Sequence, residues 1–317
     1  MKYPHKLLLI ILLFVLAVVC SFYIGATKIP LHAIFSAEFR PIVNLRITRI
    51  LLGILYGAGL GVCGVVLQAI LRNPLAEPYL LGTSSGAGFG AVVAIMLGIN
   101  SAYLPAGAFI GALVTFILIY NLAKEGESIP VHSLILFGVI TAMALSGLII
   151  FFISLSRNQA MNGMMWWLLG NLQVYDYRLL GVAGTIVVAG IIVLFVFAQD
   201  LNAFSLGEEE AVHLGIDIIR VKKILFIIVS LITGALVSVA GMIGFVGLIM
   251  PHMARLLVGP NHKTLIPATV LLSAAFLIIC DTIARSIMPP VEIPIGVITS
   301  LVGSPIFIYL LKRKRKM

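Results

Sequence analysis

Long stretches without a charged side chain divide this sequence from end to end. A helix needs roughly 20 predominantly apolar residues to cross a bilayer. Of the 317 residues here, 61% are hydrophobic and 10% are charged, whereas a soluble domain carries about 25% charged residues. The sequence therefore predicts an all-α, polytopic membrane protein with about ten transmembrane helices. It excludes an ordinary soluble enzyme, a disordered chain and a nucleic-acid-binding domain.

The expected spans have apolar centres and polar flanks, and they cover residues 7–26, 47–70, 80–98, 104–123, 131–155, 178–198, 222–240, 241–258, 265–288 and 295–311. Asn100 and Pro105 favour a turn that divides the third span from the fourth. The charge-free stretch 224–254 is long for one span and short for two. We divide it near Gly241, because cations at both chain ends favour an even number of spans, and we expect the eighth span to be short or broken.

Basic residues indicate the orientation of the spans. Lys2 and Lys6 open the chain, and a basic tail at 312–317 closes it. With ten spans and both termini in the cytoplasm, 14 of the 21 Lys and Arg residues fall on the cytoplasmic side, as the positive-inside rule requires. This rule accounts for the net charge of +9 without a nucleic-acid partner.

Residues 158–175 are too polar to cross a membrane. They carry five amide side chains together with Trp166 and Trp167, and tryptophan is enriched at membrane interfaces. We expect an interfacial segment on the periplasmic side. No linker divides the chain, so residues 1–317 are predicted to form a single transmembrane domain.

Sequence patterns for catalysis or metal binding are few. The chain contains no Gly-Lys dipeptide and hence no Walker A loop, and its histidines show no paired ligand spacing. Cys20, Cys63 and Cys280 lie far apart in apolar runs, so we expect free thiols and neither a disulfide nor a metal site. Asp281 and Arg285 stand four residues apart and are interpreted as a structural pair on one helix face. The chain has no visible energy source of its own.

Four motifs carry more information. In the first, Pro74 and Pro78 follow Asn73 and bracket a non-helical turn before Gly82, Ser84 and Ser85. The second lies in the polar loop at about 200–223. There, a short helix is expected, with Glu208 to Glu210 in its first turn and Gly215 as its cap. The third contains Pro251 and His252, and the fourth contains Glu292, Pro294 and Gly296 after Arg285.

In this order and spacing, the four motifs resemble the FecCD-type permeases, the membrane subunits of ATP-binding-cassette (ABC) importers for iron-siderophores, haem and vitamin B12. The resemblance runs from about Leu45 to Leu311. It implies a fold like that of the vitamin B12 importer permease, with ten transmembrane helices per subunit, in the cytoplasmic (inner) membrane of a prokaryote.

The resemblance also implies partners and a function. Family members work as homodimers, or sometimes heterodimers, with two ABC ATPase subunits and an extracytoplasmic substrate-binding protein. ATP and Mg²⁺ are bound by the ATPases, and this chain is expected to bind no cofactor and catalyse no reaction. Iron-siderophore is the favoured substrate, with haem or vitamin B12 as alternatives. An ion-coupled secondary transporter is the rival class.

Site residues follow from the same resemblance. The ATPase contact is expected in the 200–223 loop, on Leu206, Gly207, Glu208, Glu209, Ala211, Gly215 and Arg220. Docking of the binding protein is expected on Arg46, Arg49 and Arg285, although Thr48 stands where many members have proline. The translocation path, lined by spans five and ten, is expected near Ser84, Ser85, Val131, His132 and Ser133.

Overall fold

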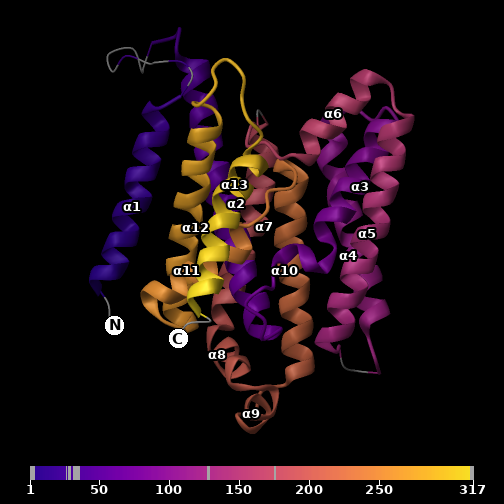
Figure 1. Ribbon diagram of the computed structural model, residues 1–317, viewed down its shortest axis with the longest axis vertical. Helices are drawn as coiled ribbons and strands as arrows, with labels where there is room; N and C mark the ends of the chain where they lie inside the picture. Colours follow the sequence, from indigo (N-terminus) through magenta and orange to yellow (C-terminus); the bar gives the residue numbers. More distant parts are fainter. Residues whose placement is uncertain are drawn as a thin grey trace.

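The computed structural model describes residues 4–25, 27, 30, 36–126, 129–174 and 176–314, except the side chains of 4, 311, 313 and 314. Helices stand side by side along the long axis of the molecule (Figure 1). The described part of the chain contains helices and connecting segments but no strand. The predicted all-α fold is therefore confirmed.

The helices, in chain order, are α1 (Pro4–Tyr23), α2 (Arg40–Ile70), α3 (Thr83–Met96), α4 (Leu104–Ala123), α5 (Val131–Leu155), α6 (Asn158–Leu168), α7 (Tyr177–Val196), α8 (Ala198–Leu206), α9 (Glu208–His213), α10 (Ile218–Ala240), α11 (Val246–Val258), α12 (His262–Ala284) and α13 (Ile295–Lys314). Two short 3₁₀ helices, η2 (Pro78–Leu81) and η3 (Ser101–Tyr103), precede α3 and α4.

Each predicted span lies on a helix of its own. Seven helices among the described residues are long and apolar enough to cross a membrane: α1, α2, α4, α5, α7, α10 and α12. The shorter apolar helices α3, α11 and α13 coincide with the other three predicted spans. The polar segment that we expected not to cross forms the 11-residue helix α6.

The bundle has two distinct ends. α1 begins and α13 ends at the end where α9 lies, while α6 lies at the opposite end (Figure 1). Both chain ends on the same side are what an even number of crossings requires. We call the end with α6 the outer end and the end with α9 the inner end.

The division of the long apolar stretch near Gly241 is confirmed. α10 stops at Ala240, and α11 begins at Val246. Gly241 and Phe245 both have left-handed backbone angles, with φ of 71° and 70°, so the chain breaks its helical path between them. Glycine adopts such angles without steric cost, whereas phenylalanine does so rarely.

Two tyrosines satisfy the backbone at this break. The Tyr56 hydroxyl donates to the carbonyl of Gly241 over 2.6 Å. The Tyr79 hydroxyl donates to the carbonyl of Ile243 over 2.8 Å and accepts from its N–H over 3.0 Å. Unpaired backbone groups are costly within a bilayer, so these side chains allow a non-helical segment between two buried helices.

Close backbone approaches hold the bundle together. α2 packs against α10, α11 and α12, and its glycines lie at the contacts. A Cβ atom on Gly64 would lie 1.8 Å from the carbonyl oxygen of Gly247, and one on Gly57 would lie 2.5 Å from that of Ser273. α3 and α4 meet in the same way at Gly86 and Gly111. The glycine steps thus serve helix packing, as small residues do in membranes.

Replacing Gly64 with alanine is expected to destabilise the protein. The methyl group would force α2 away from α11, and overpacking of this kind costs about 1–3 kcal/mol. Gly181→Ala on α7 is the matched control, because no atom lies within 4 Å of its added Cβ. Thermal unfolding in detergent should show a lower midpoint for Gly64→Ala alone. Equal midpoints for the two variants would contradict the close approach.

Candidate coupling helix and outer-end charge network

The helix α9 lies at the tip of the inner end (Figure 1). Three glutamates, Glu208 to Glu210, occupy its first turn, where negative charge interacts favourably with the helix dipole. Ala211 is fully buried and anchors the helix. The predicted short acidic helix is therefore present at the expected position.

A Schellman motif ends α9. Gly215 has φ of 80° and follows the C-cap residue Leu214. Its N–H donates to the carbonyl of Val212 over 2.8 Å, and the N–H of Ile216 donates to that of Ala211 over 3.1 Å. These two bonds define the motif. A six-residue helix with such an end is a short, rigid unit.

An ion pair joins α9 to α10. The Lys222 ammonium lies 2.7 Å from the Glu208 carboxylate, and the lysine side chain is only 8% exposed. Asp217 caps α10 by accepting a hydrogen bond from the N–H of Arg220 over 3.0 Å. A displacement of α9 would consequently pull on the start of α10, because a buried lysine loses its charged partner if the two separate.

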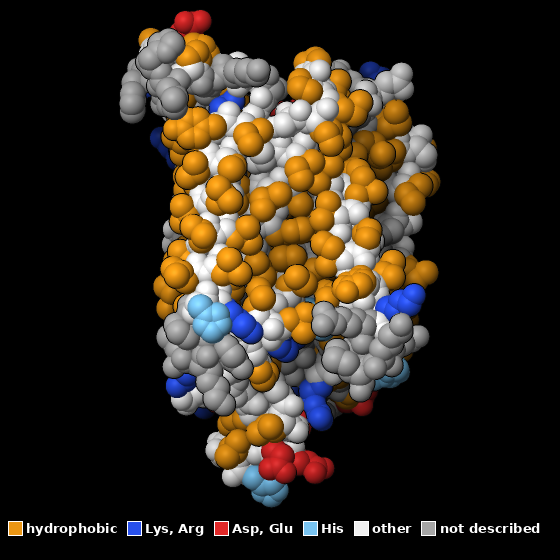
Figure 2. All heavy atoms as spheres, turned by 60° about the vertical axis from the view of Figure 1, so that its left-hand side comes forward, with side chains coloured by type: hydrophobic (Ala, Val, Ile, Leu, Met, Phe, Trp, Pro, Cys, Tyr) orange, Lys and Arg blue, Asp and Glu red, His pale blue; other side chains and the backbone are white. Residues whose placement is uncertain are grey.

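The surface of α9 and its flanks is both apolar and acidic. Leu206, Val212 and Leu214 are 68%, 58% and 65% exposed, beside the exposed Glu209 and Glu210. Figure 2 shows acidic, histidine and hydrophobic side chains gathered at this tip. Reasoning from sequence identified the acids and Leu206 but not Val212 and Leu214, whose exposure depends on the helix orientation.

The residues predicted to line the translocation path lie at two helix starts. Ser84 and Ser85 are buried in the first turn of α3, where the Ser85 hydroxyl donates to the carbonyl of Gly82. Gly82-Thr83-Ser84-Ser85-Gly86 has the spacing of the GxSxG motif of hydrolases. That motif requires a strand before the serine, whereas the 3₁₀ helix η2 stands here.

The other predicted path residues begin α5, close to α9. Val131 is the first residue of α5, His132 is exposed, and Ser133 donates to the Glu125 carboxylate over 2.8 Å. A cavity of about 200 Å³ lies between this helix start and α9–α10, with Val131, Glu208 and Lys222 among its walls. The structure thus brings the start of α5 and α9 together, and it places Ser84 and Ser85 elsewhere.

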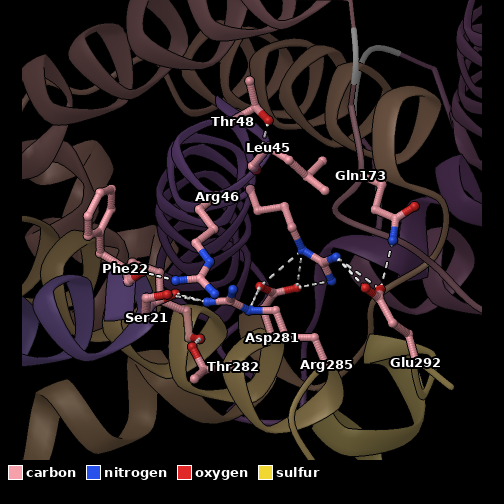
Figure 3. A network of polar contacts seen from close by, with 12 residues as sticks. Ser21, Phe22, Leu45, Arg46, Thr48, Gln173, Asp281, Thr282, Arg285 and Glu292 are labelled. Atoms are coloured by element: carbon pink, nitrogen blue, oxygen red, sulfur yellow. Dashed lines mark hydrogen bonds and ion pairs between the residues drawn. The ribbon is translucent and has the colours of Figure 1, made fainter. Parts of the chain in front are cut away.

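A largely buried network of charged groups lies at the outer end, and Figure 3 shows its side chains from close by. Arg49 of α2 binds Asp281 of α12 at 2.8 Å and Glu292 at 2.9 Å. The Gln173 amide, from the segment after α6, donates to Glu292 over 2.7 Å. Sequence analysis had placed Glu292 in a motif without assigning it a partner. Its partner lies 243 residues away.

Arg285 and Arg46 complete the network toward α1. Arg285 lies 3.3 Å from Asp281, which confirms the predicted pair, and it donates to both oxygens of Ser21. Arg46 donates to the carbonyls of Phe22, Tyr23 and Thr27. The network therefore ties α1, α2 and α12 to the segments that precede α7 and α13.

This geometry bears on the predicted docking arginines. Arg46, Arg49 and Arg285 are 4%, 5% and 5% exposed, and partners within the chain occupy all three guanidinium groups. Docking of an external binding protein on them stays a prediction. In this conformation, a carboxylate from outside would have to replace an internal partner.

The remaining motif residues shape the backbone. Asn73 accepts a hydrogen bond from the N–H of Leu75 and, with Pro74, turns the chain. Gly82 has φ of 70° between η2, which begins at Pro78, and α3. Pro251 lies inside α11, followed by His252. Gly296 follows Pro294, and a Cβ on it would lie 2.7 Å from the carbonyl oxygen of Leu169.

Asp281→Asn is expected to be strongly destabilising. The change removes the charge that Arg49 and Arg285 share, and an uncompensated buried charge costs about 3–5 kcal/mol. Glu292→Gln is expected to cost less, because the Glu292 side chain is 35% exposed and water can compensate Arg49 there. Unfolding midpoints in lipid nanodiscs should rank wild type, Glu292→Gln and Asp281→Asn in falling order. The reverse order for the two variants would show that Asp281 is not the centre of the network.

The described residues contain no cluster of three or more His, Cys, Asp or Glu side chains that could hold a metal ion. Cys20, Cys63 and Cys280 are all free thiols. The features that remain for function are the helix α9, the start of α5 and the outer network.

Comparisons with known proteins agree with this arrangement. The chain is 41% identical over 270 residues to the cobalamin import system permease protein BtuC of Halobacterium salinarum, covering 85% of this chain and 72% of that protein. It is 34% identical over 320 residues to the hemin transport system permease protein HmuU of Yersinia pestis, covering 97% and 95%. It is 32% identical over 306 residues to the Fe(3+) dicitrate transport system permease protein FecD of Escherichia coli, covering 93% and 94%.

A solved structure described as an inward-facing, metal-chelate type ABC transporter superposes with a TM-score of 0.88. It is 32% identical in sequence and covers 98% of this chain and 99% of its own. The profile of the FecCD transport family matches residues 10–313. The chain therefore belongs to the FecCD transport family.

Proposed function

We propose that this chain is the transmembrane permease subunit of an ABC importer that moves a metal chelate across the cytoplasmic membrane. The observation that carries the proposal is α9: a short, capped helix with an exposed apolar and acidic surface at the inner end. Such a helix can seat in a cleft of a partner and transmit its movement as a rigid body.

The energy for transport comes from partner subunits in this proposal. Two ATPase subunits bind ATP and Mg²⁺ and contact α9, and their closure moves it. The Lys222–Glu208 pair and Val131 line the same cavity, so a movement of α9 has only a short distance to travel to the start of α5. A second permease subunit, as a homodimer, completes the path, and an extracytoplasmic binding protein delivers the chelate at the outer end. Both termini of the chain then lie in the cytoplasm.

Iron-siderophore is the substrate that we favour. Haem and vitamin B12 are the alternatives, because relatives of comparable similarity are named for cobalamin, hemin and ferric citrate. A secondary transporter fits the structure less well. Such a protein needs a titratable group within the membrane that is free to change its charge. The Asp281 carboxylate is instead held between Arg49 and Arg285.

Reversing the charge of α9 is expected to uncouple the importer. Glu209→Lys would place a cation on the exposed first turn of α9 without touching the buried Ala211, so the chain should fold normally. Substrate-stimulated ATP hydrolysis and uptake in proteoliposomes should fall at least about tenfold, since a like-charge contact in an interface costs several kcal/mol.

Lys263→Glu, an exposed charge reversal at the inner start of α12, serves as the control and should retain uptake. If Glu209→Lys assembled with the ATPases and transported normally, α9 would not be the coupling element. Ion-driven uptake by the chain alone, without ATP or partners, would instead favour the secondary transporter.

A further inference from the structure

A second cavity, distinct from the coupling site, lies at the outer end. Its volume is about 630 Å³, within the 300–1,000 Å³ typical of small-molecule sites. Its walls come from the ends of α3 and α10, the start of α4, and α6 with its flanking segments. The residues that line it all come from one chain, on the side where an external substrate would arrive.

Aromatic side chains form part of its wall. Trp166 and Trp167 of α6 both line the cavity, and they are the only two tryptophans in the sequence. Leu104 and Val239 add apolar surface. Indole rings stack on flat π systems, so this wall suits a ligand with aromatic faces.

The polar part of the wall carries one formal charge, which is positive. Arg157, the N-cap residue of α6, lines the cavity, and no Asp or Glu does. Among the residues that the structure describes, none bonds the Arg157 guanidinium group. It differs in this from the buried arginines of the outer network, whose guanidinium N–H groups already bind partners within the chain.

The outer network lies beside the cavity and adds to this charge. Gln173 lines the cavity and donates to Glu292, and the Glu292 charge is already compensated by Arg49. The network combines three arginines with two carboxylates, a formal excess of one positive charge. An anionic ligand is therefore favoured at this end over a neutral one.

We propose that this cavity binds an anionic chelate with aromatic faces, such as a ferric complex of catecholate ligands, at the outer end of the permease. Arg157 supplies a charge-assisted hydrogen bond to the anion, and the two indoles contact its rings. The inference rests on the proposed importer function and narrows its substrate class. Haem, which is also anionic and aromatic, shares this chemistry, whereas an uncharged hydroxamate chelate does not.

The two tryptophans provide a direct readout. The full-length chain in nanodiscs of zwitterionic lipid is titrated with three probes: ferric tris-catecholate, haemin and a neutral ferric trihydroxamate. Tryptophan fluorescence is corrected for absorption with free N-acetyltryptophanamide. Saturable quenching is expected from an anionic aromatic probe. Comparing the ferric tris-catecholate titration with the haemin titration distinguishes catecholate from haem as the ligand. The trihydroxamate is expected to give no saturation.

Arg157→Gln is expected to raise the apparent Kd about tenfold or more, because a hydrogen bond to a charged group contributes about 1.5–3 kcal/mol. Arg178→Gln, an exposed arginine at the start of α7 outside the cavity, is the matched control and should leave the Kd unchanged. Arg157→Lys should restore part of the affinity. Partial rescue of the affinity by lysine would show that the weaker binding of Arg157→Gln comes from the lost charge and not from a loss of fold.

Equal quenching by the neutral and anionic probes, or an unchanged Kd in Arg157→Gln, would overturn the proposal. The measurement uses neither ATP nor partner subunits. Failure of quenching alongside normal ATP-driven uptake would therefore reject this site and leave the importer function standing. Saturable quenching without ATP-driven uptake would support this site and reject the importer function.

Discussion

Within a bilayer, a backbone N–H or C=O group without a partner costs several kcal/mol, and this constraint shapes the whole chain. Every expected crossing is a helix, so the backbone bonds itself. The non-helical segment between α10 and α11 persists because Tyr56 and Tyr79 bring hydroxyl groups to its carbonyls. α13 begins close to this break, because a Cβ on Gly296 would lie 3.3 Å from the carbonyl oxygen of Met242.

Charge is distributed according to the same physics. At the outer end, Arg49, Arg285 and Asp281 are buried together, since each guanidinium would be costly without its carboxylate. At the inner end, the acids of α9 stay exposed and only Glu208 is paired, with a buried lysine. The first arrangement holds helices together, and the second leaves a rigid, charged surface free for a partner.

Much of the architecture could be predicted from residues alone. The apolar runs placed each span, and the polar segment with Trp166 and Trp167 corresponds to α6. The acidic first turn and Gly215 located α9, because caps and dipoles act over a few residues. The partners of Arg49 could not be found in this way. They lie 232 and 243 residues from it along the chain, and no local pattern reports such a contact.

Sequence by itself determined that the chain resides in a membrane, which stretches of it form the apolar helices, and which family motifs it carries. These follow from hydrophobicity and short-range backbone bonding, which depend on neighbouring residues. Only the tertiary structure decided that the outer arginines are buried, that α9 adjoins the start of α5, and that Arg157 shares a cavity with both tryptophans. Those features depend on which helix faces meet, and packing between distant segments sets that choice.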